Sequence, residues 1–232
     1  KNAQQLRALS TRTYAQKDPV FFEGGCGEHV SGLIFAAKQN PNLSEADLIA
    51  VEADEDAPPL PLTYTSGHFK FFYTASSANP NDNVTLAQIQ ATAVIMNNAW
   101  IDFATNFKEP KHYVAGSIKL IDVLVYDLGP YLSGQTTSGW NHIELSSNQV
   151  VRDDCKRQTI PVHQLFHRVQ YAYDYISGTP NLKWAVEATA CWSQKYRAAA
   201  VGDWKPRMNS GLSNPDVNLI TNRSSDACHL WV

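Results

Sequence analysis

The sequence predicts an α+β fold, in which a mixed β-sheet is backed by one long helix and further helices form the C-terminal part. Strand-like segments lie at 68–74, 117–128 and 142–147, and helix-like segments lie at 85–107 and 159–173. This order of strand, helix, strand, strand, helix differs from the repeated strand-helix-strand units of a parallel α/β sheet. A chain of 232 residues with 44% hydrophobic and 18% charged residues can also bury a sizeable core.

Residues 1–62 are predicted to form an N-terminal extension, and residues 63–232 the main domain. Within the extension, a glycine-rich turn at 24–27 separates two short helix-like patches. Residues 52–62 contain four acidic residues and three prolines, which exclude a helix or a central strand and indicate a linker. The extension is interpreted either as a prosegment that covers the functional site or as a simple extension. The apolar residues 230–232 suggest that the main domain is truncated.

A long helix is predicted to begin after Thr85, whose side chain can cap the first turn. Its apolar residues step by three and four positions, so they form one stripe that faces the core. Pro110 cannot continue a helix and is expected to end this one. The stripe consists of Ile89, Ala93, Met96, Trp100, Phe103 and Phe107. Its aromatic members are therefore interpreted as core residues and not as a cofactor site.

Strands are predicted on both sides of this helix in the sequence. Residues 68–74 alternate between polar and apolar side chains, and residues 117–128 are rich in β-branched residues. Residues 129–139 are polar and glycine-rich and are predicted to be a loop, and residues 142–147 form a short alternating strand. We expect these strands to form one sheet against the apolar stripe.

Composition and charge exclude several classes of function. The chain has 19 Lys and Arg residues against 22 Asp and Glu, and no basic cluster is denser than Lys156-Arg157, so nucleic acid is not an expected partner. No apolar run approaches the ~20 residues of a membrane helix. The four cysteines form no CxxC pair, which argues against a zinc knuckle. Sequons at Asn42, Asn83 and Asn222 favour a secreted, extracellular protein.

The segment 159–173 carries the residues that point to metal chemistry. Thr159 is predicted to cap a helix that has Pro161 in its first turn. His163 and His167 then lie one turn apart on one face, where two imidazoles can share a metal ion. A later helix carries Glu187, and a carboxylate there would complete a catalytic zinc site of the His₂Glu type. Alternatively, Glu187 is an acidic residue near the N-terminus of its helix, where the helix dipole favours a negative charge, and the two histidines only pack in the core.

The pattern His163-Gln-Leu-Phe-His167 followed by Trp184-Ala-Val-Glu187-Ala-Thr-Ala resembles the HExxH and WxxEGxA motifs of gluzincin zinc metallopeptidases, particularly bacterial secreted ones. The resemblance extends over roughly residues 63–200 and implies a zincin-like mixed sheet with the zinc helix beneath it. It also implies that His163, His167 and Glu187 bind Zn²⁺ and that the substrate is a peptide or protein. Ala188 stands where the family often has Gly, which a helix tolerates.

In this family the edge strand of the sheet lines the cleft and pairs with an extended substrate. The resemblance therefore suggests the segment 142–147 as the edge strand, with His142, Ile143, Glu144 and Leu145 as substrate-binding residues. A downstream side chain usually stabilises the developing oxyanion, and Tyr196 and His229 are the residues proposed for this role. Cys191, one turn after Glu187, is interpreted as a buried or disulfide-bonded residue, with orientation of the ligand as the alternative.

One departure from the family concerns the general base. Gln164 stands directly after the first histidine, where the family has Glu. A neutral amide cannot accept a proton from a zinc-bound water, so the chain is expected to hydrolyse peptides poorly or not at all. Gln nearly matches Glu in size and is the usual substitution for inactivating such an enzyme, so one interpretation is that Gln164 was engineered. The other interpretation is that the chain is a natural pseudopeptidase. A third hypothesis is a domain without metal.

Overall fold

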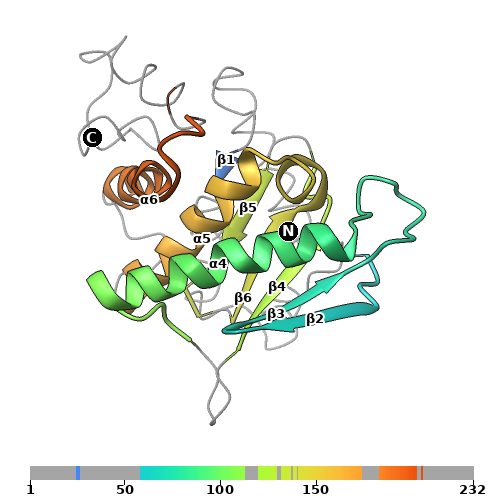
Figure 1. Cartoon of the computed structure of the whole chain (residues 1–232), viewed down its shortest axis with the longest axis horizontal. Helices are drawn as coiled ribbons and strands as arrows, with labels where there is room; N and C mark the ends of the chain where they lie inside the picture. Colours follow the sequence, from blue (N-terminus) through green and yellow to red (C-terminus); the bar gives the residue numbers. More distant parts are fainter. Residues whose placement is uncertain are drawn as a thin grey trace, which may run out of the picture.

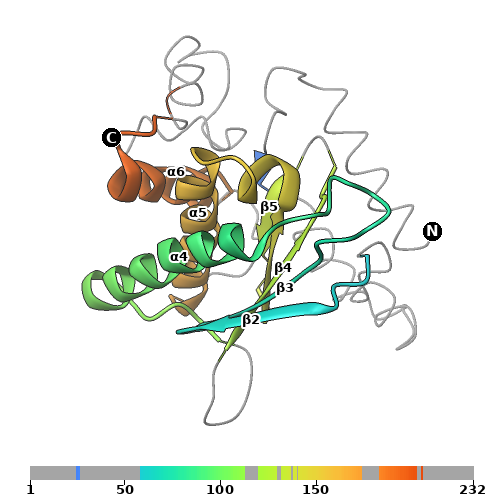
Figure 2. The same ribbon diagram turned by 45° about the vertical axis from the view of Figure 1, so that its right-hand side comes forward.

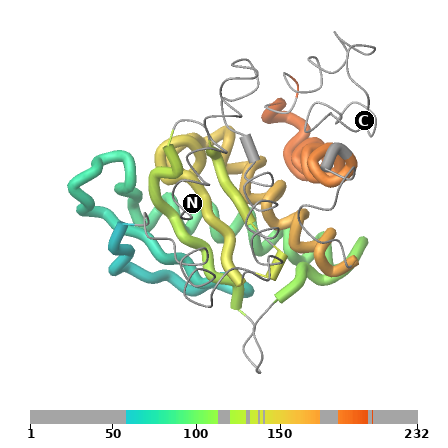
Figure 3. The backbone as a smooth tube through the Cα atoms, turned by 180° about the vertical axis from the view of Figure 1, so that it is seen from behind, coloured from blue at the N-terminus to red at the C-terminus, as the bar shows by residue number. Residues whose placement is uncertain are grey.

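The fold combines one mixed β-sheet with helices that lie on one of its faces. In this computed structural model, three helices, α4, α5 and α6, lie on the same side of the sheet, and α6 packs against α5 (Figures 1 and 2). Seen from behind, the strands come forward and these helices lie beyond them (Figure 3). The structure describes residues 25–26, 58–112, 120–129, 132–136, 138–139, 141–173, 183–202 and 205.

The sheet has six strands in the order β1-β5-β6-β4-β3-β2. The three central strands β6, β4 and β3 run parallel to one another. Strand β2 pairs antiparallel with β3, β5 pairs antiparallel with β6, and β1 pairs parallel with β5. The strands are β1 (Gly25–Cys26), β2 (Leu62–Ser66), β3 (Phe69–Tyr73), β4 (Ile121–Tyr126), β5 (Leu132–Thr136) and β6 (His142–Ser146). The prediction of a mixed α+β architecture is thus confirmed.

Helix α4 (Leu86–Asn106) forms as the sequence predicts. Its N-cap is Thr85, whose hydroxyl accepts a hydrogen bond from the Gln88 backbone, while the Gln88 side chain accepts one from the Thr85 backbone. This reciprocal pair satisfies two amide groups that a helix start leaves without partners. The helix ends at Asn106, before Pro110. Five residues of the predicted stripe are buried: Ile89, Ala93, Met96, Trp100 and Phe103.

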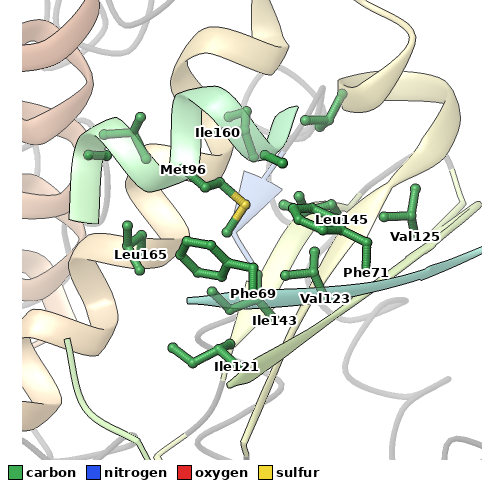
Figure 4. Packing of buried hydrophobic residues seen from close by; sticks show 14 of the residues in the cluster. Phe69, Phe71, Met96, Ile121, Val123, Val125, Ile143, Leu145, Ile160 and Leu165 are labelled. Atoms are coloured by element: carbon green, nitrogen blue, oxygen red, sulfur yellow. The ribbon is translucent and has the colours of Figure 1, made fainter. Parts of the chain in front are cut away.

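The core lies between the sheet and the helices that cover it. Alternate side chains of the central strands point toward the helices, among them Phe69, Val123 and Ile143, all fully buried (Figure 4). Met96 from α4 and Leu165 from α5 meet them from the other side. Because this layer fixes α5 against the sheet, it also fixes the position of the histidines that α5 carries.

Three strands, β1, β2 and β5, lie where the sequence predicts none, and β1 falls inside the glycine-rich turn predicted at 24–27. Strand β2 begins at Leu62, the last residue of the predicted linker, and a two-residue turn joins it to β3. Gly67 in that turn has φ +54°, a conformation that glycine adopts readily. Strand β5 lies inside the predicted loop 129–139. The sequence does not predict it because Leu-Ser-Gly-Gln-Thr has little β preference and because the strand pairs with β1, which is distant in the chain, and with β6, which comes later.

The third helix is held to the other two by aromatic side chains. Phe166 of α5 lies edge-on to Trp192 of α6 at 6.0 Å between ring centroids, and Phe103 of α4 packs edge-on against Phe166 at 5.2 Å. Phe107 and Tyr196 complete this group. Edge-to-face contacts of this kind add about 1 kcal/mol each beyond their buried area. No helix in the described part of the chain has the length and apolar character that a membrane span requires.

Candidate metal centre

Helix α5 (Lys156–Ala172) positions two of the predicted ligands, but it begins a turn earlier than predicted. The short π-helix η2 (Ser147–Val151) leads from β6 toward it. Asp153 Oδ1 accepts hydrogen bonds from the backbone N–H groups of Cys155 and Lys156, at 2.9 Å each. Thr159 is therefore not the N-cap, and Pro161 lies inside the helix. Cys155 is the N-cap residue, and the Asp153 carboxylate accepts from the backbone N–H groups at the start of the helix.

The three predicted metal ligands lie together, two on α5 and one on α6 (Lys183–Ala198). The Nε2 atoms of His163 and His167 are 3.1 Å apart. Glu187 Oε2 lies 3.5 Å from His163 Nε2, and Glu187 Oε1 lies 3.9 Å from His167 Nε2. One ligand atom from each residue falls within 4.8 Å of the others. This buried group could hold a metal ion.

The distances within this group fit a single metal ion. Metal-to-ligand bonds of 2.0–2.2 Å in a tetrahedral site place the ligand atoms roughly 3.3–3.6 Å from one another. The distances of 3.1, 3.5 and 3.9 Å bracket this range, so small side-chain movements would complete the geometry. Three protein ligands also leave a fourth coordination position for another group.

Burial determines the protonation state of His167. The side chain has no exposed surface, and this burial lowers its pKa to about 4, with a further lowering from His163. The Glu187 charge and a hydrogen bond to Gln170 oppose the shift without cancelling it. His167 is therefore neutral at pH 7, the form in which imidazole binds a metal.

The histidine ring is held by a residue that the sequence analysis did not single out. Gln170 Oε1 lies 2.7 Å from His167 Nδ1. Ligating histidines usually donate their second ring N–H in this way, which directs the other nitrogen to the metal. The spacing of three residues after His167 could have drawn attention to Gln170, because positions three apart lie on one helical face.

Strand β5 runs against the helix at the position of Gln164. A Cβ on Gly134 would lie 3.2 Å from Gln164 Cγ and 3.0 Å from the Glu144 carbonyl oxygen. Glycine therefore allows the strand to approach the helix closely. The Tyr171 hydroxyl also donates to the Thr136 carbonyl at 3.1 Å, which ties α5 to the end of the strand. Gln164 itself is 1% exposed.

The predicted edge strand is wrong, because β6 lies inside the sheet with β5 on one side and β4 on the other. Its backbone cannot add a further strand. Ile143 and Leu145 are core residues, and Glu144 is fully buried where it accepts a hydrogen bond from Gln135. His142 Nε2 lies 3.5 Å from Glu144 Oε1. The strand that lies along α5 is β5.

The structure does not bring Tyr196 to the metal-ligand group. Tyr196 lies nine residues after Glu187 on α6, about 13 Å along the helix axis. Its ring stacks on Trp192, and its hydroxyl lies 3.4 Å from Asp102 Oδ1 of α4. It belongs to the aromatic group that joins the helices. Cys191 is buried on α6, and His229 lies outside the described residues.

Comparisons of the chain with protein-family models, with curated proteins and with solved structures found no match. The functional interpretation therefore depends on the geometry and chemistry of the site.

The lowered pKa of His167 makes the stability of the metal-free chain depend on pH. Between pH 6.5 and about 4, the unfolded chain binds a proton at this residue and the folded chain does not, so acid favours unfolding. We expect the free energy of unfolding in chelator to fall by on the order of 3 kcal/mol across this window. Denaturant titrations at several pH values measure this, and His167→Gln should remove that part of the decline. Parallel pH curves for the two proteins would contradict the prediction.

Proposed function

We propose that this chain is a zinc metallopeptidase domain of the gluzincin type, with the base position occupied by Gln164. The observation that carries the proposal is the His163, His167 and Glu187 group, assembled from two helices with distances that suit one ion. Two imidazoles and one carboxylate form the donor set of catalytic zinc sites, which keep the fourth position open for water or substrate. The resemblance of the motifs to gluzincins supports the same assignment.

The side chain at position 164 decides whether such a site can cut peptides. When bound, zinc lowers the pKa of a coordinated water and polarises a carbonyl group. Gln164 is buried on the same helix as both histidines, but its amide can neither accept a proton nor return one to the leaving amine. We infer that the chain as written cleaves extended peptides poorly or not at all. Peptide hydrolysis by the zinc-loaded Gln164→Glu variant, compared with the unmodified chain, tests this inference.

An extended peptide is proposed to pair with β5 rather than with β6. Strand β5 lies along the metal-binding helix, where Gly134 approaches Gln164. Addition of a strand to a sheet edge gives affinity through main-chain hydrogen bonds. The outer edge of β5 is paired with β1 from the N-terminal region, in parallel orientation, with Gly25 opposite Leu132 and Cys26 opposite Gly134.

We propose that this arrangement is a closed form in which the N-terminal region occupies the substrate edge. Two observations support the proposal. Strand β1 uses the edge of β5 that a substrate would need, and the three ligand residues are at most 1% exposed. A peptide cannot reach a metal ion held by side chains that are so fully buried. The proposal favours the prosegment interpretation of the N-terminal region over that of a simple extension.

Disrupting β1 should open the peptide site. The double variant Gly25→Pro/Cys26→Pro removes two backbone donors and disfavours the pairing with β5. We expect an extended fluorescent peptide to bind the variant at least tenfold more tightly than the unmodified chain, because the peptide no longer competes with β1. Fluorescence anisotropy measures the affinity, and proline substitutions at two of the residues 52–56, within the predicted linker 52–62, serve as a control. Equal peptide affinity in both variants would count against the closed form.

A natural pseudopeptidase is the second candidate function. The observation that favours it is Gln164 itself, which preserves the size of Glu and removes its charge. Such a protein would retain the metal and hold an extended peptide without cleaving it. A native gene that encodes Gln at this position favours the pseudopeptidase, and a native Glu favours an engineered form of an active enzyme.

A further inference from the structure

We propose that Gln170 is a positioning residue that sets the tautomer of His167 and joins the two ligand-bearing helices. The inference rests on the metal site proposed above, and it adds a residue outside the two motif segments 163–167 and 184–190. Gln170 lies on α5, three residues after His167, and the two side chains are linked directly.

The direction of each hydrogen bond follows from the chemistry of the partners. Gln170 Nε2 lies 2.9 Å from the carbonyl oxygen of Val186, which can only accept. The NH₂ end of the amide must therefore face α6, and the oxygen must face His167. Since an amide oxygen can only accept, His167 Nδ1 carries the proton at the 2.7 Å contact. His167 Nε2 is then left with its lone pair.

The lone pair of His167 points into the ligand group. Its Nε2 lies 3.1 Å from His163 Nε2 and 3.9 Å from Glu187 Oε1. A ring in the opposite tautomer would present a proton at this position and could not coordinate an ion. Gln170 thus selects the form of the ring that can bind a metal.

The same amide also anchors α6 beside the third ligand. Gln170 Nε2 donates to Thr189 Oγ1 at 2.7 Å, and the Thr189 hydroxyl donates to the Ala185 carbonyl at 2.7 Å. Together with the bond to Val186, these contacts involve residues both before and after Glu187 in the sequence. Gln170 therefore aligns the carboxylate of α6 with the histidines of α5, and it acts through them rather than on a substrate.

Three variants separate the two contributions of Gln170. Gln170→Leu removes both the acceptor for His167 and the donor to α6. Gln170→Glu keeps an acceptor for His167 and removes the donors. Thr189→Val is the matched control, because it removes one partner on α6 and leaves the bonds to His167 and Val186. Far-ultraviolet circular dichroism establishes that each variant is folded.

Nuclear magnetic resonance of the histidine ring nitrogens at pH 7.5 in chelator reports the tautomer directly. We expect Nδ1–H at His167 in the unmodified chain, in Gln170→Glu and in Thr189→Val, and a mixture of tautomers in Gln170→Leu. A predominantly Nε2–H ring in the unmodified chain would overturn the inference. This readout needs neither bound zinc nor activity, and the unmodified chain alone suffices if Gln170→Leu does not fold.

Competition with a chromophoric chelator measures the zinc dissociation constant. We expect Gln170→Leu to raise it about 10–100-fold, the usual effect of losing a group that orients a ligand. Thr189→Val, which removes one of the two contacts of Gln170 with α6, should raise it less than Gln170→Leu does. Zinc affinity in Gln170→Leu within threefold of the unmodified chain would overturn the inference. An unmodified chain that binds no zinc would instead refute the proposed function, while the tautomer measurement would still decide the role of Gln170.

Discussion

Gln164→Glu is expected to give the zinc-loaded chain a peptidase activity at least a hundredfold above that of the unmodified chain. General acid–base catalysis by a positioned side chain contributes typically about 10²–10⁴-fold to a rate. The substitution restores a carboxylate at a buried position on the helix that carries His163 and His167. Burial tends to raise the pKa of a carboxylic acid, which suits a group that must take up a proton and return it.

Hydrolysis of an internally quenched peptide and of a denatured protein measures this gain. The assay is run with β1 intact and in the Gly25→Pro/Cys26→Pro background, because the proposed closed form would limit substrate access. Gln164→Met is the control for the size of the side chain, and adding His163→Ala to Gln164→Glu controls for contaminating proteases. If the zinc-loaded Gln164→Glu variant cleaves nothing in either background, the peptidase assignment is wrong.

Zinc is expected to raise the free energy of unfolding by about 4 kcal/mol when its free concentration is a thousandfold above the dissociation constant. The reason is that the folded chain holds the three ligands within 4.8 Å of one another, whereas the unfolded chain does not. For a domain of this size, the melting temperature should rise by roughly 10 °C. Thermal unfolding followed by circular dichroism, with zinc and with chelator, measures the shift.

Glu187→Gln is the matched variant for this experiment. It keeps the shape of the side chain but removes the charged ligand, so most of the stabilisation by zinc should disappear. Equal melting temperatures of the unmodified chain in zinc and in chelator would favour the third hypothesis, in which the histidines only pack in the core.

The parts of the fold that the sequence predicts well have strong local signals. For helix α4, the sequence predicts the cap at Thr85 and an apolar stripe; Thr85 is the N-cap in the structure, and five of the six stripe residues are buried. Strand β4 is predicted from its β-branched residues. The predicted start of α5 is misplaced because Asp153 accepts from the backbone N–H groups of Cys155 and Lys156, so the helix begins before Thr159. Strand β5 is missed because its formation depends on pairing with β1 and β6 rather than on its own residues.

The candidate site, like the fold, is predicted from the sequence only in part. The histidine pair follows from helical spacing alone, and Glu187 follows from the motif that accompanies such a pair. The substrate-binding segment and Tyr196 depend on the order of strands and on the packing of α6, which the sequence does not specify. Gln170 was missed because its role depends on Val186 and Thr189, which belong to another helix.

Metal content is the most direct test of the central claim, that His163, His167 and Glu187 form one zinc site. Elemental analysis of the purified chain after incubation with zinc at neutral pH should give one zinc per chain, and His163→Ala should lose it while remaining folded. Full zinc occupancy in His163→Ala would place the metal elsewhere. No zinc in the unmodified chain would mean that the buried histidine pair is structural, and the peptidase proposal would then be wrong.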